Sequence, residues 1–237
     1  MRPLKTLFVL TSHSVKGATG KPTGWYLSEA SHPWKALKDA GVAVDFVSPK
    51  GGEAPVDGFD LSDPLNRGFW EDPVVQAKLK RTLRPDEVRP AEYQAIHFVG
   101  GHGTMWDFPD DAGLAGIASA IYAQGGIVAA VCHGPAGLVN VKRADGTFLV
   151  DGKRVACFTN EEETKVGLNE VVPFLLADKL RERGSIPVAA APWSDNVIVD
   201  GRLMTGQNPQ SAGSLGKKLA EALRAFAASE AAQPALR

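Results

Sequence analysis

The sequence is poor in cysteine, since its 237 residues include only Cys132 and Cys157. A disulfide framework of the kind that stabilises small secreted proteins uses more cysteines than this. The apolar run at 7–10 is too short for the core of a secretory signal, and no small-residue cleavage site follows it. No apolar run approaches the length of a membrane span. We therefore expect a cytoplasmic protein with no disulfide and no membrane partner.

An excess of one charge is also lacking. The 26 basic and 27 acidic residues are interspersed, so no basic stripe indicates nucleic-acid binding. The glycine pattern of dinucleotide-binding folds, G-x-G-x-x-G, is absent, and so is the Walker phosphate loop. His13, His32 and His102 follow no zinc-binding spacing, so metal binding would require the fold to gather them. We expect no nucleic-acid partner, no metal and no cofactor.

What the sequence does contain is an alternation of short apolar runs and helical patterns. Hydrophobic residues make up 44% of the chain and charged residues 22%, as in a globular domain with a packed core. The runs at 7–10, 42–48, 95–99 and 127–131 predict buried strands, and 34–40 and 112–124 predict helices. This order implies right-handed crossovers and strands covered on both faces. We predict one α/β domain over 1–237, a three-layer sandwich with a mainly parallel sheet.

The second half of the chain is less regular. The segments 148–150 and 154–158 predict a hairpin around Asp151-Gly152, and a helix is expected at 171–183. Strands are expected at 197–199 and 203–205, joined by Asp200-Gly201, followed by a closing helix at 214–228 and a frayed tail after about 229. The region 51–90, rich in Pro, Asp and Gly, reads as an insertion without a predicted fold.

The stretch A-V-C-H-G-P, residues 130–135, lies where the predicted strand at 127–131 ends. Ligands of open α/β sheets bind at the carboxyl ends of strands. Ala130 and Gly134 are the small residues that a nucleophile elbow requires two positions before and after the nucleophile, Cys132. A following helix would favour a thiolate there. The alternative is an inert core cysteine, which is how we interpret Cys157 in its strand pattern.

A second glycine-rich loop, G-G-H-G at 100–103, follows the predicted strand at 95–99. Glycines allow backbone amides to approach a ligand closely. The amides of Gly101 and His133 could therefore form an oxyanion hole, with Gly100 and His102 beside it as candidate substrate-binding residues. Trp193 and Asn208 are equally compatible with the pocket edge and with turn or core roles.

Four motifs together resemble the PfpI-type superfamily: A-V-C-H-G-P, G-G-H-G-T, T-G-W-Y-L-S-E-A-S-H-P and T-G-Q-N-P-Q-S-A. This is the class I glutamine-amidotransferase-like group of flavodoxin-type fold that includes the parkinsonism-associated deglycase. Within it, the chain is most similar to the heat-shock chaperone/glyoxalase III branch. The four motifs fall in family order and span nearly the whole chain.

The resemblance implies roles for individual residues. Cys132 matches the nucleophile and His133 its neighbour in the catalytic dyad, while Glu29 matches the carboxylate that contacts the sulfur. The acid that orients the histidine comes from F-T-N-E-E-E-T, with Glu163 as the best match and Glu162 as the alternative. No histidine follows His133, so the glutaminase chemistry of some relatives is not expected.

The implied function is a glutathione-independent glyoxalase that converts methylglyoxal to D-lactate through a hemithioacetal on Cys132, with Glu29 or His133 as the proton-transfer base. Protein deglycase activity and a homodimer are also implied. Three alternatives remain open: a holdase chaperone, a redox sensor that uses Cys132, and a cysteine peptidase or amidase.

Overall fold

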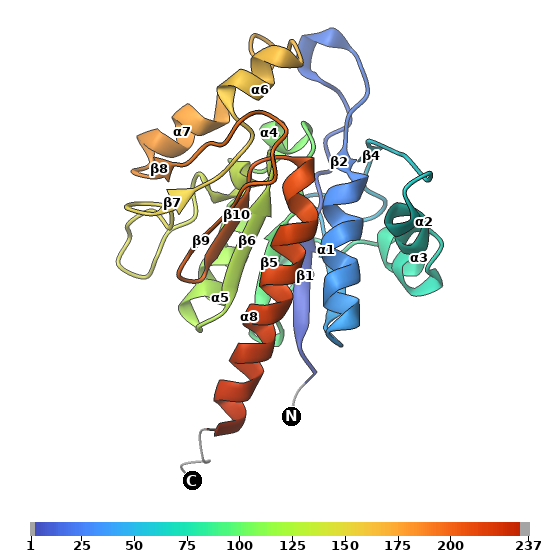
Figure 1. The fold of residues 1–237 in the computed structure, drawn as a ribbon, viewed down its shortest axis with the longest axis vertical. Coiled ribbons are helices and arrows are strands. Elements are labelled where there is room, and N and C mark those ends of the chain that lie inside the picture. The colour runs from blue at the N-terminus through green and yellow to red at the C-terminus, as the bar shows by residue number, and fades with distance from the viewer. Residues whose placement is uncertain (1–2, 233–237) are drawn as a thin grey trace.

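The protein folds around a six-stranded sheet with the strand order β3-β1-β5-β6-β10-β9 (Figure 1). The structure, a computed structural model, describes residues 3–232. The first five strands of that order run parallel, and β9 pairs antiparallel with β10 at one edge. The strands are β1 (Lys5–Val9), β3 (Ala43–Val47), β5 (Ala95–Phe98), β6 (Ile127–Val131), β9 (Val197–Asp200) and β10 (Leu203–Gly206). The predicted, mainly parallel sheet is confirmed.

Helices cover both faces of this sheet and enclose two apolar cores. α1 (Leu27–Asp39) and α8 (Ala212–Ala232) lie side by side on one face (Figure 1) and bury leucines against it. α5 (Ala112–Ala123) and α7 (Leu176–Glu182) contribute to the core on the other face. Every residue of β6 is buried, as expected for a strand covered on both sides. The three-layer, flavodoxin-like α/β sandwich is confirmed.

The first long helix begins earlier than the sequence predicts. The helix expected from the sequence spans 34–40, directly after Pro33, a residue that usually interrupts a helix. In the structure α1 runs from Leu27 through Pro33 to Asp39. The predicted start is therefore wrong, and its correction places Glu29 in the first turn of a long helix, preceded by the short strand β2 (Trp25–Tyr26).

The region 51–90 is ordered into short elements. β4 (Val56–Asp57) pairs with β2, and α2 (Pro64–Trp70) and α3 (Pro73–Leu79) follow. Both helices start with an aspartate whose side chain accepts amide hydrogen bonds and with proline as the first helical residue. Two 3₁₀ turns, Pro85–Glu87 and Pro90–Glu92, lead into β5.

Two predictions for the second half are wrong. The expected hairpin does not form, because β7 (Arg154–Val155) pairs parallel with β8 (Ile186–Pro187), while Phe148 makes only an isolated bridge to Lys142. Long-range pairing thus overrides the local Asp-Gly turn. The helix expected at 171–183 begins only at Leu176, and Pro173 disfavours helical backbone at the residue before it.

The closing elements match the prediction more closely. β9 and β10 are joined by a tight turn at 200–203, and α8 forms the expected last helix. That helix continues to Ala232, and the tail expected to fray after about 229 falls mostly on residues 233–237, which lie outside the described residues. The remaining elements are α4 (Thr104–Asp107), α6 (Asn160–Lys165) and three further 3₁₀ turns, Gly17–Thr19, Gly134–Leu138 and Pro209–Ser211. Among the described helices, none combines the length and apolar character that crossing a membrane requires.

Candidate active site

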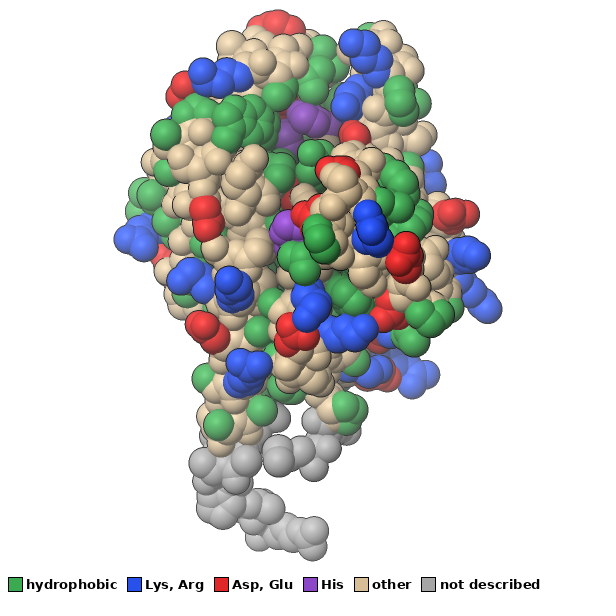
Figure 2. Space-filling view, turned by 45° about the vertical axis from the view of Figure 1, so that its right-hand side comes forward, with side chains coloured by type: hydrophobic (Ala, Val, Ile, Leu, Met, Phe, Trp, Pro, Cys, Tyr) green, Lys and Arg blue, Asp and Glu red, His purple; other side chains and the backbone are tan. Residues whose placement is uncertain are grey.

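The four sequence motifs converge at the carboxyl ends of the central strands. The amide of Tyr26 donates to the carbonyl of Gly100, and the amide of Cys132 donates to the carbonyl of Gly206. These bonds connect segments from β2, β5, β6 and β10. Figure 2 shows histidine side chains in a recess near the upper end of the molecule, bordered by hydrophobic side chains. The ends of the parallel strands therefore form the candidate site.

Cys132 lies on a strained turn directly after β6. Its φ angle is +58°, in the left-handed region that a residue with a side chain rarely adopts. The turn needs small neighbours, because a Cβ atom on Gly134 would collide with the carbonyl of Phe98. A Cβ on Gly100 would collide with both the Glu29 carboxyl and Cys132. This geometry is the predicted nucleophile elbow, and strain at one side chain is a frequent mark of a functional site.

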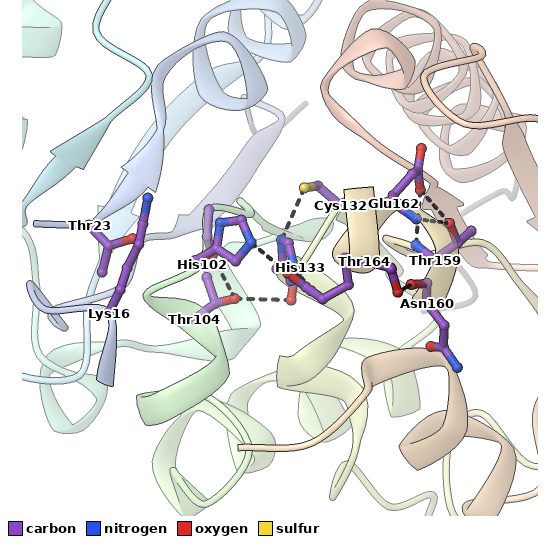
Figure 3. Close-up of polar contacts among 12 residues, drawn as sticks. Lys16, Thr23, His102, Thr104, Cys132, His133, Thr159, Asn160, Glu162 and Thr164 are labelled. Atoms are coloured by element: carbon purple, nitrogen blue, oxygen red, sulfur yellow. Dashed lines mark hydrogen bonds and ion pairs between the residues drawn. The ribbon is translucent and has the colours of Figure 1, made fainter. Parts of the chain in front are cut away.

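His133 connects the thiol of Cys132 to a carboxylate (Figure 3). Its Nδ1 lies 3.3 Å from Sγ of Cys132, and its Nε2 lies 2.7 Å from Oε2 of Glu163. A carboxylate accepts hydrogen bonds only, so Nε2 carries the ring proton and Nδ1 is free to accept one. The imidazole is thereby held in the tautomer that can receive the thiol proton.

Burial and neighbouring charges set the protonation of this pair. Burial, together with nearby His102, lowers the pKa of His133 to about 4, so the ring is neutral at physiological pH. Burial works to raise the pKa of Glu163, but His133 and His102 outweigh it and hold the pKa at about 2. Nε2 of His102 lies 2.9 Å from the other carboxylate oxygen of Glu163, and the two histidine rings are 4.1 Å apart. At neutral pH a neutral imidazole therefore faces an ionised carboxylate.

Glu29 reaches the thiol from the first turn of α1 and is completely buried. Within the described residues neither of its carboxyl oxygens has a hydrogen-bond partner of ordinary geometry. Burial raises the pKa of Glu29 to about 8, and the adjacent Cys132 thiol and Gly100 amide reduce this increase only in part. Glu29 is consequently protonated in most molecules at neutral pH, beside the sulfur.

The thiol of Cys132 is not the stabilised thiolate that the elbow pattern suggested. Burial and the charge of Glu29 raise its pKa well above the ordinary value, although the amide of His133 opposes this. The following helix was expected to stabilise the thiolate, but it is a five-residue 3₁₀ turn and therefore lowers the pKa of the thiol only slightly. Cys157, interpreted as a core residue, is buried on the other side of the sheet, and burial raises its pKa to about 12.

The sequence left open whether Glu163 or Glu162 faces the histidine, and the structure places Glu163 there. Glu162, although adjacent, is buried in a separate network. One of its oxygens accepts from the amide and the hydroxyl of Thr159, and the other accepts from Trp193 N–H, Gln207 Nε2 and Asn208 Nδ2. Glu162 therefore anchors the loop that carries Trp193, whose φ angle is +63°.

Two aromatic rings lie beside His133: Trp193, which the sequence left open as a pocket-edge residue, and Phe158, which the sequence analysis did not single out. The Phe158 ring lies 4.4 Å from the His133 ring and 5.6 Å from the Trp193 ring, measured between centroids. Phe158 directly precedes the Thr159 cap of α6, whose first turn holds Glu162 and Glu163. The sequence signal for Phe158 is its place at the start of the F-T-N-E-E-E-T motif.

Residues 23–222 match the model of the DJ-1/PfpI family. The chain belongs to this family. It is 37% identical over 242 residues to the glutathione-independent glyoxalase HSP31 of Saccharomyces cerevisiae, covering 94% of this chain and all of that protein. It is 32% identical over 221 residues to glyoxalase 3 of Candida albicans, covering 88% and 94% of the two chains.

Two solved structures superpose closely on the fold. The Francisella tularensis Rapid Encystment Protein of 24 kDa matches with a TM-score of 0.89 and 40% identity over 93% of this chain and 99% of its own. Glyoxalase III of Candida albicans matches with a TM-score of 0.84 and 28% identity over 92% and 97%. The resemblance stated from the four motifs, including its glyoxalase III-like branch, is confirmed.

Within this DJ-1/PfpI framework, the backbone amides of Gly101 and His133 lie in two neighbouring loops. Among the described residues, neither amide donates to a backbone carbonyl, and the His133 amide acts on the Cys132 thiol. The hydroxyl of Thr104 lies 3.0 Å from the carbonyls of both residues and so ties the two loops together (Figure 3). Gly101 has a φ angle of +103°, and a Cβ there would collide with the carbonyl of Gly24. The amides thus remain available for a substrate oxygen.

The histidines that sequence spacing left undecided lie apart. His13 stacks on Trp106 and its Nε2 lies 2.5 Å from the carbonyl of Val15, while His32 pairs with Asp63 at 2.8 Å. Neither joins His102.

In the part of the chain that the structure describes, one group has the composition of a metal site: His102, His133 and Glu163, whose ligand atoms lie within 4.8 Å of one another. Both Nε2 atoms already donate to the Glu163 carboxylate, so hydrogen bonding accounts for the cluster.

Proposed function

We propose that this protein is a glutathione-independent glyoxalase that converts methylglyoxal to D-lactate through a hemithioacetal on Cys132. Relatives that cover nearly the whole chain carry the name glutathione-independent glyoxalase, which supports the activity. The observation that carries the chemistry is the position of the Cys132 thiol between a neutral imidazole and a protonated, buried carboxyl. This arrangement supplies a nucleophile and two proton carriers without a cofactor.

The first step would be addition of the thiol to the aldehyde carbon. As the carbon–sulfur bond forms, Nδ1 of His133 takes the thiol proton, and the nearby Glu163 carboxylate stabilises the imidazolium. The aldehyde oxygen gains the electron pair in the pocket formed by the amides of Gly101 and His133, and then the proton. The high pKa of the resting thiol means that deprotonation accompanies attack instead of preceding it.

The second step would move a proton between the two substrate carbons. Glu29 is the stronger candidate for the base, because a carboxylate with a pKa of about 8 binds a proton more tightly than an imidazole with a pKa of about 4. The ionised fraction of Glu29 takes the proton from the hemithioacetal carbon, which gives an enediolate with the negative charge on the neighbouring oxygen. Glu29 then returns the proton to the neighbouring carbon while the hydroxyl proton of the first carbon moves to the neighbouring oxygen, which yields a thioester, and water hydrolyses it to lactate and the free thiol.

Methylglyoxal consumption and chiral lactate detection without glutathione would test this proposal. Wild type, Cys132→Ser and Glu29→Gln would be compared, with Cys157→Ser as the matched control because Cys157 lies in the opposite core. D-lactate is expected from wild type and Cys157→Ser, with losses of at least about 100-fold in the other two. Absence of turnover in folded wild type, or full turnover by Cys132→Ser, would contradict the proposal.

We also propose a cytoplasmic homodimer, as the family resemblance implies. Sedimentation velocity would test the dimer, which a monomeric mass at micromolar concentration would rule out.

A further inference from the structure

Glu29 depends for its position on a turn of α1 that lacks a normal hydrogen bond. In an α-helix the carbonyl of residue 29 accepts from the amide of residue 33. Residue 33 is proline, which has no amide hydrogen. The carbonyl of Glu29 is therefore left without its helical donor, in a residue that is completely buried. Buried carbonyls without a partner are costly, so another donor is expected.

His97 provides that donor from the neighbouring strand. Its Nε2 lies 3.1 Å from the carbonyl oxygen of Glu29, and its ring is fully buried on β5 with its edge toward Phe8. Burial lowers the pKa of His97 to about 4, so the ring is neutral. Since Nε2 faces a carbonyl, it carries the single ring proton. Nδ1 is then a bare acceptor, which agrees with its having no partner among the described residues.

β5 and the loop that follows it contact both the backbone and the carboxyl group of Glu29. His97 of β5 binds the backbone carbonyl, and Gly100, three residues later, lies against the carboxyl group. Pro33, one turn after Glu29 in α1, is held in place because Gly216 of α8 approaches it so closely that a Cβ there would collide with the proline ring. These constraints orient the side chain of Glu29 together with the adjacent Cys132 thiol and Gly100 amide, since neither carboxyl oxygen has a partner of ordinary hydrogen-bond geometry in the described residues.

We propose that His97 is a positioning residue for Glu29: its ring N–H replaces the amide that Pro33 cannot supply and fixes the helical turn that directs the Glu29 carboxyl at Cys132. This inference rests on the proposed function only for its effect on turnover. The geometry of the Glu29–Cys132 pair can be measured separately, through the reactivity of the thiol.

The chain offers a compensating pair of substitutions. His97→Phe keeps an aromatic ring against Phe8 but removes the donor. Pro33→Ala restores a helix amide four residues after Glu29, while keeping Cα and Cβ for the contact with Gly216. Rescue of the first variant by the second is expected only if the hydrogen bond to the Glu29 carbonyl is what His97 contributes.

The primary measurement is the rate of Cys132 alkylation by iodoacetamide against pH, in a Cys157→Ser background so that a single thiol reacts. The ionisable groups that act on Glu29 are Cys132, Asp57 and Tyr26, and none changes between the variants. His97→Phe is expected to shift the midpoint of the profile. Pro33→Ala alone is expected to leave it unchanged, and the double variant to restore it. The effect of His97→Phe should disappear in a Glu29→Gln background.

Turnover of methylglyoxal gives the second measurement. His97→Phe is expected to lower kcat about tenfold with little change in KM, with recovery to within about threefold in the double variant. An unchanged alkylation profile in folded His97→Phe, or no rescue by Pro33→Ala, would overturn the inference. Absence of glyoxalase activity in wild type would remove the proposed function and leave the alkylation result to decide the role of His97.

Discussion

The carboxylate of Glu163 lies 2.7 Å from Nε2 of His133, although the two residues are 30 positions apart. His133 belongs to the turn after β6, and Glu163 to the first turn of α6. Neighbouring Glu161 is exposed, and Glu162 is buried in its own network. Three consecutive glutamates therefore have three distinct environments, which makes them a matched series for mutagenesis.

Glu163→Gln is expected to reduce kcat at least about 100-fold, because the amide could not stabilise the imidazolium that the proposed attack by Cys132 would form. The variant should also change acid stability. The pKa of Glu163 is about 2 in the fold and ordinarily 4.5, so its stabilising contribution is present above 4.5 and lost as the pH falls toward 2. Steady-state kinetics and urea unfolding between pH 6 and 3 would measure both, with Glu161→Gln as the control. Wild-type kcat in Glu163→Gln would contradict the prediction.

Glu162→Gln is expected to act on stability first. Three N–H groups donate to one oxygen of Glu162, and other donors bond to the second oxygen. The amide of glutamine has only one acceptor oxygen, so one of these two sets of donors would lose its acceptor. We expect a loss of about 3 kcal/mol in the free energy of unfolding, together with release of the loop that carries Trp193. Urea unfolding and Trp fluorescence would measure these effects. A stability equal to that of Glu161→Gln would show that the network contributes little.

Glu29→Gln is expected to remove a pH dependence of stability. The pKa of Glu29 is raised from an ordinary 4.5 to about 8, so its contribution is complete below 4.5 and is lost as the pH rises through 8. Between pH 6.5 and 9 the wild type should lose about 2 kcal/mol that the variant retains. Above pH 6.5 the two buried histidines are neutral in the fold and have little influence. If the free energy of unfolding changed with pH in the same way for the wild type and for Glu29→Gln across this range, the result would argue against a buried, neutral Glu29.

Gly100→Ala is expected to abolish turnover and to lower the stability of the fold, because the added methyl group would also collide with the backbone carbonyl of Val131. The added methyl group would collide with the Glu29 carboxyl and with Cys132, so the pair must separate. Gly116→Ala is the matched control, because its Cβ would meet open space on α5 and should stabilise the helix by about 0.5–1 kcal/mol. Activity assays and thermal unfolding of both variants would check this. An active Gly100→Ala protein would mean that close approach of Glu29 to the thiol is unnecessary.

The sequence by itself determined the parallel α/β sheet, the elbow at Cys132 and the glycine loop beside it. These features depend on local patterns: continuous apolar runs for strands buried on both faces, and small residues where a turn admits nothing larger. The four motifs also identified the family, because each is a short segment whose residues are fixed by close contacts. Local sequence patterns also predicted β9, β10 and the last helix correctly.

Only the tertiary structure decided how the ionisable residues pair. Glu162 and Glu163 are chemically identical neighbours, and one helical step directs one of them at His133 and the other at the Trp193 loop. The sequence predicted that α1 begins after Pro33, whereas the helix runs through this proline. The donor that compensates for the missing proline amide is His97, which lies 64 residues further along the chain and so leaves no local signal. The protonation of Cys132 and Glu29 likewise depends on burial, which arises when distant segments exclude water and which no local pattern records.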